Sequence, residues 1–220
     1  MKKLFVLLMA ALFVLPMTGV STIEAQKNPF AKKLMKERKK QYKTKMVEYN
    51  KEHWKIFGST KTIEVALLEH YSELFEKGTE VYEVVGIASK FKSKSVGKQM
   101  ALNSACITYA QSAKSYVQGR VTSDMAGDGV SADNEFDHFY AAYERLVAAE
   151  IKGELKESYA IIRDLKDGTF EMQVYYIVDQ ASASKARERA MELALKETKM
   201  AQKHAEEVSN FIREGFSEYK

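Results

Sequence analysis

Hydrophobic and polar positions alternate most clearly around residue 170. Every second position of residues 169–178 carries a large apolar side chain: Phe170, Met172, Val174, Tyr176 and Val178 alternate with Glu171, Gln173, Tyr175 and Ile177. The turn Lys166-Asp167-Gly168 precedes this segment, and residues 155–162, which end in the apolar Tyr159-Ala160-Ile161-Ile162, precede the turn. Alternation beside an Asp-Gly turn is typical of a β-hairpin. The sequence therefore predicts two antiparallel strands, 155–162 and 169–178.

Two further segments have the composition of strands. Residues 80–91 are rich in β-branched and apolar side chains, with Gly86 in their middle. A glycine inside a strand indicates either a bulge or the close approach of another backbone. Residues 54–57 form a short apolar stretch that ends at Gly58-Ser59. We expect there either a first strand or a segment that packs against the core.

Four segments show helical spacing of apolar or small side chains. Residues 63–77 have Thr60 or Thr62 as N-cap and Gly78 as C-cap. Residues 96–125 are rich in small side chains, which let a neighbouring helix or sheet come close. The other two helices are predicted at 135–151 and 181–219. The packing side of the last one consists of Ala183, Ala186, Ala190, Leu193, Ala194, Ala201, Ala205, Val208 and Ile212.

This order of elements predicts an α+β fold. We expect a small antiparallel three- to four-stranded sheet packed by long alanine-rich helices. Part of the chain also resembles a known family. The resemblance lies in a strand with an internal glycine (VVGIAS, 84–89), a helix with regularly spaced alanines and the segment VQGRV at 117–121. These residues resemble the LPP-twenty lipoprotein-like family of bacterial envelope proteins, over about residues 81–200. The resemblance implies a dodecin-like α+β domain in an envelope-associated, often oligomeric, non-enzymatic protein.

The first 25 residues have the pattern of a secretory signal peptide. A basic start at Lys2 and Lys3 leads into an apolar run from Leu4 to Pro16, and a polar stretch then ends at Ala25. The run holds about 13 residues, fewer than the ~20 of a membrane-spanning helix. We therefore expect export and cleavage after Ala25, which places the protein in the periplasm or at the outer membrane.

The single cysteine limits how the protein is held together and anchored. Exported lipoproteins carry their lipidated cysteine directly after the cleavage site, but Gln26 stands there and the one cysteine is Cys106. We expect no lipid anchor by that route, which departs from the family that the chain resembles. One cysteine also forms no internal disulfide. Its helical spacing with Leu102 and Tyr109 favours a buried apolar residue, and a reactive or intermolecular thiol is the alternative.

Charge divides the expected mature chain into a basic arm and a slightly acidic body. Residues 26–52 hold ten Lys or Arg and three Glu, a net charge of +7, and this leaves −4 on residues 53–220. The expected domains are therefore the signal peptide 1–25, a basic helical arm 26–52 and a single α+β domain 53–220. The arm suits an anionic membrane surface or an acidic partner, and a solvated helix or flexible spacer is the alternative interpretation. A nucleic-acid partner is not expected. The candidate contact residues are Lys32, Lys33, Lys36, Arg38, Lys39 and Lys40.

An acidic loop at residues 124–135 is the one candidate metal site. Its twelve residues match an EF-hand loop at positions 1, 5, 6 and 12, so Asp124, Asp128 and Glu135 are candidate calcium ligands. Position 3 is Ala126, where calcium needs an oxygen ligand, and no second loop is present. A flexible connection between two helices is the alternative interpretation of this loop.

The sequence contains no recognisable catalytic pattern. Its four histidines match no metal-ligand spacing, and His70 lies on a charged helical segment. Nucleophile-elbow, Walker and dinucleotide-binding motifs are absent from the 220 residues. Tyr175, Ile177 and Ile161 fall on the hairpin face opposite Phe170 and its neighbours, so we expect them to form an exposed apolar strip for a partner, or to be covered by the terminal helix or the arm.

Three functional hypotheses follow. The first is an exported, non-enzymatic envelope protein that self-associates or docks on an envelope partner. The second is a small-molecule-binding oligomer, because dodecin-like folds build ligand sites between subunits. The third is a hydrolase whose site carries no recognisable motif.

Overall fold

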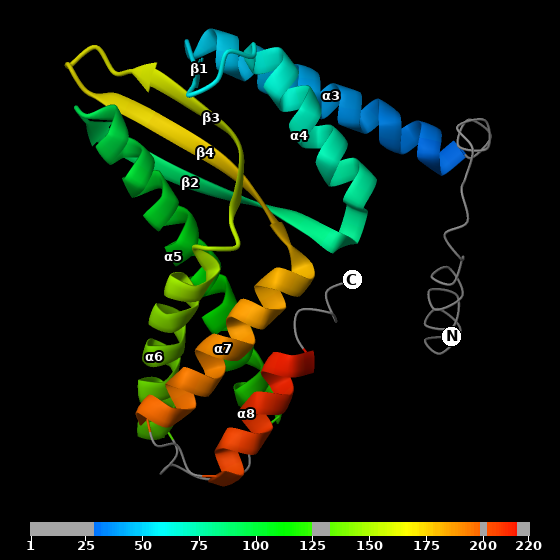
Figure 1. Ribbon diagram of the computed structural model, residues 1–220. Helices are drawn as coiled ribbons and strands as arrows, with labels where there is room; N and C mark the ends of the chain where they lie inside the picture. The colour runs from blue at the N-terminus through cyan, green and yellow to red at the C-terminus, as the bar shows by residue number, and fades with distance from the viewer. Residues whose placement is uncertain (1–28, 125–132, 199–201, 215–220) are drawn as a thin grey trace. The chain divides into compact units, whose positions relative to one another are not determined.

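The computed structural model describes residues 29–124, 133–198 and 202–214. It confirms the α+β fold, since these residues form six α-helices and one four-stranded antiparallel sheet (Figure 1). The helices are α3 (Pro29–Lys51), α4 (Ile63–Lys77), α5 (Lys94–Asp124), α6 (Asp133–Ile151), α7 (Gln180–Thr198) and α8 (Gln202–Glu214). The strands are β1 (Lys55–Phe57), β2 (Val81–Phe91), β3 (Lys156–Asp164) and β4 (Phe170–Asp179), and a 3-10 turn, Gly78–Glu80, joins α4 to β2.

Local sequence signals set the ends of these elements. Of the two candidate caps, Thr62 begins α4, because its hydroxyl accepts a hydrogen bond from the Val65 N–H at 3.2 Å. Gly78 ends the same helix at a φ of 53°, a conformation that suits glycine. The predicted hairpin is confirmed as β3 and β4, and its turn places Lys166 and Gly168 at positive φ.

The strand order β1-β3-β4-β2 makes β2 an edge strand of eleven residues. The other edge is β1, which has only three residues and pairs with β3. Strands β3 and β4 lie between these edges, and β4 pairs with both β3 and β2. The two edges of the sheet therefore differ greatly in length.

Gly86 brings helix α5 into contact with the sheet. A Cβ atom added at Gly86 would lie 2.0 Å from the carbonyl oxygen of Ala101 and 3.1 Å from the Cβ of Ala105. The close approach expected for this glycine is therefore confirmed. The bulge lies further along β2, where the pairing with β4 shifts between Ala88 and Phe91 and Lys90 has a φ of 56°.

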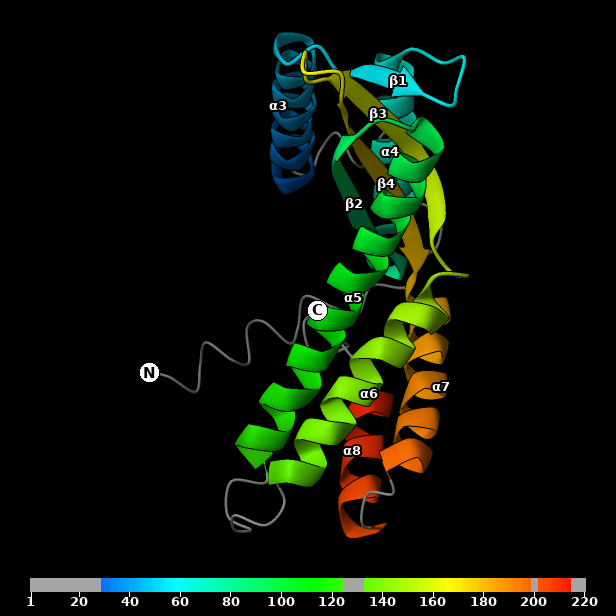
Figure 2. The same ribbon diagram turned by 90° about the vertical axis from the view of Figure 1, so that its left-hand side faces the viewer.

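Beyond the sheet, α5 continues into a layer of helices (Figure 2). It packs first on β2 and β4 and then against α6, which in turn packs against α7. The alanines of α7 fit this contact, since Ala183, Ala186, Ala190 and Ala194 are all fully buried. These helices and the α5 side of the sheet share one hydrophobic core.

The prediction of one terminal helix over 181–219 is wrong. Two helices, α7 and α8, occupy this range, and α8 packs against both α7 and α5. Val208 and Ile212 of α8 are buried as expected, but Leu193 of α7 is 43 % exposed. The spacing of small and apolar residues identifies most of the buried side chains of the two helices. It does not reveal that the chain forms two helices here rather than one.

The chain separates into two compact units, residues 1–47 and 48–220. Helix α3 runs across this boundary, and the second unit begins at Glu48, five residues before the expected start at His53. The side chain of Tyr49 is fully buried, so the last turn of α3 belongs to the body of the protein. Among the described residues, no helix combines the length and the apolar character needed to cross a membrane.

Replacing Gly86 by alanine tests the contact between α5 and the sheet. We expect Gly86→Ala to lower the free energy of unfolding by roughly 3 kcal/mol, because the new methyl group meets a backbone carbonyl that cannot move alone. The matched control is Gly119→Ala, at a glycine within α5 where an added Cβ would have open space around it. This control should gain about 0.5–1 kcal/mol from helix propensity. Urea unfolding measures both, and equal stabilities would contradict the packing described here.

Candidate functional site

A cluster of tyrosines covers the side of the sheet opposite α5. The hydroxyl of Tyr49 lies 3.0 Å from that of Tyr159 and donates a hydrogen bond to that of Tyr175 at 2.9 Å. Tyr159 and Tyr175 are neighbours on β3 and β4, and their rings stack at 4.4 Å between centroids. Burial raises the pKa of Tyr49 and of Tyr159, so both hydroxyls stay protonated at neutral pH and keep their hydrogen bonds.

This arrangement decides between the two expectations for the strip. Exposure to a partner is wrong, whereas cover by the arm is confirmed at Tyr175, because Tyr49 belongs to residues 26–52. Tyr175, Ile177 and Ile161 are only 5 %, 3 % and 0 % exposed. The strip is covered within the chain, because α4 packs against β3 and β2 and Tyr49 bonds to Tyr175. The sheet is thus buried on both faces, and these three residues offer no surface to a partner.

His70 joins three elements at the edge of the tyrosine cluster. From α4 its Nδ1 lies 2.9 Å from the Ser158 hydroxyl on β3, and its Nε2 lies 2.6 Å from a carboxylate oxygen of Glu83 on β2. The pairing of β3 with β4 shifts between Glu157 and Tyr159, which places Ser158 at the irregularity. Sequence reasoning missed this group, because its members lie 13 and 88 residues from His70.

The hydrogen-bond chemistry of this group assigns its donors. An ionised carboxylate only accepts, so Nε2–H donates to Glu83. In the neutral imidazole, Nδ1 then accepts from the Ser158 hydroxyl. Serine, imidazole and carboxylate are hydrogen-bonded in the order of a catalytic triad, but with the two ring nitrogens exchanged relative to the usual triad. The imidazole has no exposed surface, and it packs edge-on against Tyr159 at 5.2 Å. The group therefore acts first as a polar clamp that holds α4 on the sheet.

A groove follows the outer edge of β2 on the α5 side. It has a volume of about 550 Å³ and is lined by Thr79, by residues 81–85, by Gln180 and by Thr108, Tyr109 and Ser112 of α5. The rings of Tyr82 and Tyr109 stack at 6.1 Å beside it. Arg187 of α7, which is 98 % buried, donates a hydrogen bond to the Tyr109 hydroxyl at 2.6 Å. The groove is an open channel beside a strand edge, with a buried cation behind one wall.

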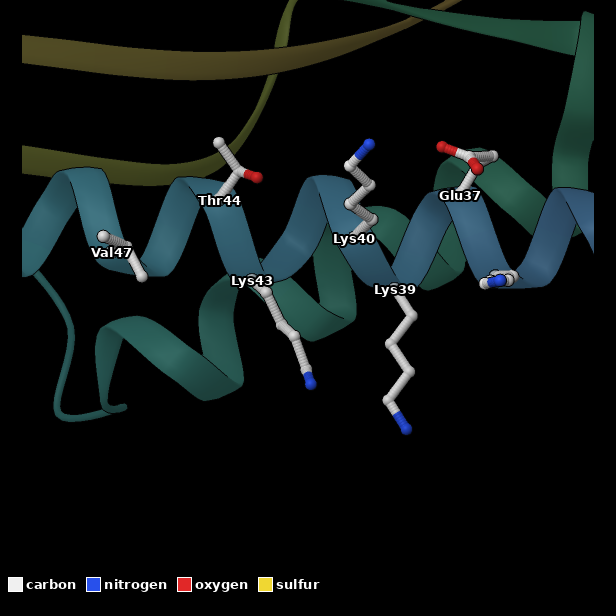
Figure 3. A pocket seen from close by; sticks show the side chains of 7 residues that line it. Glu37, Lys39, Lys40, Lys43, Thr44 and Val47 are labelled. Atoms are coloured by element: carbon white, nitrogen blue, oxygen red, sulfur yellow. The ribbon is translucent and has the colours of Figure 1, made fainter.

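The basic arm presents its lysines to solvent. Lys32, Lys33, Lys36, Lys39 and Lys40 of α3 are all exposed, and Arg38 is half-buried. A hollow of about 520 Å³ along α3 is lined by this helix alone, from Lys36 to Val47. Figure 3 shows Lys40 and Thr44 directed to one side of the helix and Lys39 and Lys43 to the other. Side chains that diverge in this way form a charged surface rather than a binding cavity.

The calcium candidate lies largely outside the described residues. Asp124 is the last residue of α5 and Glu135 falls in the first turn of α6, but Asp128 lies in 125–132. Within 29–124, 133–198 and 202–214, no three His, Cys, Asp or Glu side chains gather to hold a metal ion. Calcium binding at this loop stays a prediction.

Cys106 is a core residue. It is 4 % exposed, and burial raises the pKa of its thiol, which keeps the thiol in its unreactive protonated form. The buried interpretation is confirmed.

Comparison with known proteins returned no relatives. No protein-family model matches the chain, and neither the curated proteins nor the solved structures contain a significant match to it.

Loss of the His70 side chain tests the clamp. We expect His70→Ala to lower the free energy of unfolding by about 3 kcal/mol, because two buried hydrogen bonds and a filled volume are lost together. The control is His138→Ala on the exposed side of α6, which should change stability by less than about 0.5 kcal/mol. Chemical denaturation compares the two variants, and a His70→Ala protein as stable as the control would show that the clamp contributes nothing.

Proposed function

We propose that this chain is an exported, non-enzymatic protein of the bacterial cell envelope that acts by binding. In this proposal the first 25 residues direct export, the α+β body self-associates or docks on an envelope partner, and the basic arm meets an anionic surface. The signal-peptide pattern and the resemblance of residues 81–121 to the LPP-twenty family support the location. The body carries no lipid-anchor cysteine, so attachment would depend on charge and protein contacts.

The observation that carries the proposal is the exposed row of lysines on α3. Five lysines lie within nine residues, all directed to solvent, and the compact unit of the acidic body begins only at Glu48. Each lysine close to an anionic bilayer contributes about 1 kcal/mol of attraction. A row of five is therefore enough to hold a folded protein at such a surface without an apolar anchor.

A second candidate function is small-molecule binding by an oligomer. The groove beside β2 favours it, because stacked Tyr82 and Tyr109 and the hydroxyls of Thr108 and Ser112 offer both an apolar wall and hydrogen-bonding groups. A ligand that co-purifies with the protein and is lost in a Tyr82→Ala variant would raise this candidate above the first.

Vesicle flotation tests the surface contact of the arm. We expect the protein without residues 1–25 to float with vesicles containing one third phosphatidylglycerol and to stay in solution with pure phosphatidylcholine. Changing Lys32, Lys33, Lys36, Lys39 and Lys40 to Gln should reduce binding more than tenfold, because five attractive charges are removed.

A matched variant separates this effect from net charge. Five exposed lysines of the body are changed to Gln in it: Lys55, Lys92, Lys152, Lys185 and Lys196. This variant has the same net charge as the arm variant and should bind anionic vesicles almost as the parent does. Equal losses in the two variants, or no binding by the parent, would contradict a role for the arm.

A further inference from the structure

We propose that β2 is the edge through which two copies of this chain pair. In this assembly the β2 strands of two copies run antiparallel about a twofold axis near Val85, and the two sheets become continuous. The inference rests on the proposed function and deepens it, because it names the surface and the partner of the self-association.

The backbone of β2 supplies the first argument. The N–H of Ile87 donates to the Ser104 hydroxyl on α5 at 3.4 Å, so it points away from β4. Hydrogen-bonding direction alternates along a strand, and Val81, Glu83 and Val85 therefore also direct their N–H and C=O groups outward. No strand of the described residues pairs with this side of β2. The groove lined by Thr79 and residues 81–85 opens along the same stretch, which leaves room for an added strand.

The flank of α5 beside this edge is apolar and exposed. Because Ser104 reaches Ile87, the side of α5 that carries Ser104 faces the edge. Met100 and Ile107 lie four residues before and three residues after Ser104, on the same side of the helix, and Val96 lies one turn further. These three side chains are 42 %, 50 % and 52 % exposed in the order Met100, Ile107 and Val96. Large apolar side chains grouped beside an open strand edge mark an association surface.

The charges on β2 identify a second copy as the occupant. Glu80 immediately precedes β2, Lys90 lies near its end, and Lys92 follows it. Glu83 is already bonded to His70, so Glu80 and Lys90 are the charges that two paired strands would bring together. An antiparallel copy brings the acidic end of each strand to the basic end of the other, so attraction occurs twice. A parallel copy would place like charges together. A twofold axis requires a self-complementary surface, and this strand has one.

A charge-exchange experiment tests the pairing. Sedimentation velocity of the chain without residues 1–25 should show a monomer–dimer equilibrium that weakens as salt rises. Glu80→Lys alone and Lys90→Glu alone should each weaken the dimer about tenfold, because each brings like charges together at both ends. An equal mixture of the two variants should recover dimerisation as a heterodimer, because all the facing charges are then opposite.

Control variants on α7 show whether the effect is local. Lys185→Glu and Glu192→Lys change exposed charges away from β2 and should leave the dimer unchanged, alone or mixed. Ile107→Lys should weaken the dimer more than tenfold, whereas Leu193→Lys, at a residue of similar exposure, should not.

The outcomes separate this inference from the function on which it rests. A dimer whose stability does not change when Glu80, Lys90 or Ile107 is substituted would overturn the β2 interface. Self-association itself would still stand. A strict monomer at all concentrations would overturn both the interface and self-association, while vesicle binding by the arm would be unaffected.

Discussion

The contact between Gly86 and the Ala101 carbonyl fixes the position of α5, and the rest of the body depends on it. With the helix backbone seated on the strand, Ala105, Ala110 and Ala113 are completely buried. The same helix then carries this close packing beyond the sheet to α6 and α7. A larger residue at position 86 would lift α5 away and would open the main hydrophobic core along its length.

Helix α5 covers one face of the sheet and α4 covers the other. A partner can therefore reach the sheet at an edge but not at a face. The tyrosine cluster and the clamp of His70, Ser158 and Glu83 close the α4 face with hydrogen bonds rather than with apolar packing alone. A short strand, β1, occupies one edge. Among the strands that the structure describes, only β2 offers a long run of outward main-chain groups, and the groove and the exposed flank of α5 lie beside it.

The sequence predicts those features that arise from neighbouring residues. Alternation around Asp167-Gly168 identified the hairpin, the Thr62 and Gly78 signals identified both ends of α4, and Gly86 indicated the close approach of another backbone. These features depend on local conformation and on the size of one side chain. Their physical causes are present in a window of a few residues.

Features that depend on distant partners were not predictable in the same way. Alternation separates Tyr175 and Ile177 from the α5 face but does not show that α4 covers them. Exposure and cover by the terminal helix or the arm therefore both stayed open, and α4 was not among the expected covers. His70 looked like a helix-surface residue because Ser158 lies 88 residues away. Likewise, the buried Arg187 belongs to a charged stretch of α7, and its contact with Tyr109 depends on how α7 packs against α5.

The most direct test of this account is amide hydrogen exchange along β2, measured residue by residue at low and high protein concentration. In dilute protein, Val84 and Gly86 should exchange slowly because they face β4, and Glu83 and Val85 should exchange quickly because they face outward. At high concentration Glu83 and Val85 should become protected as the second copy pairs with them. Uniform protection of all four amides at every concentration would show that the edge is covered within one chain and would contradict the account.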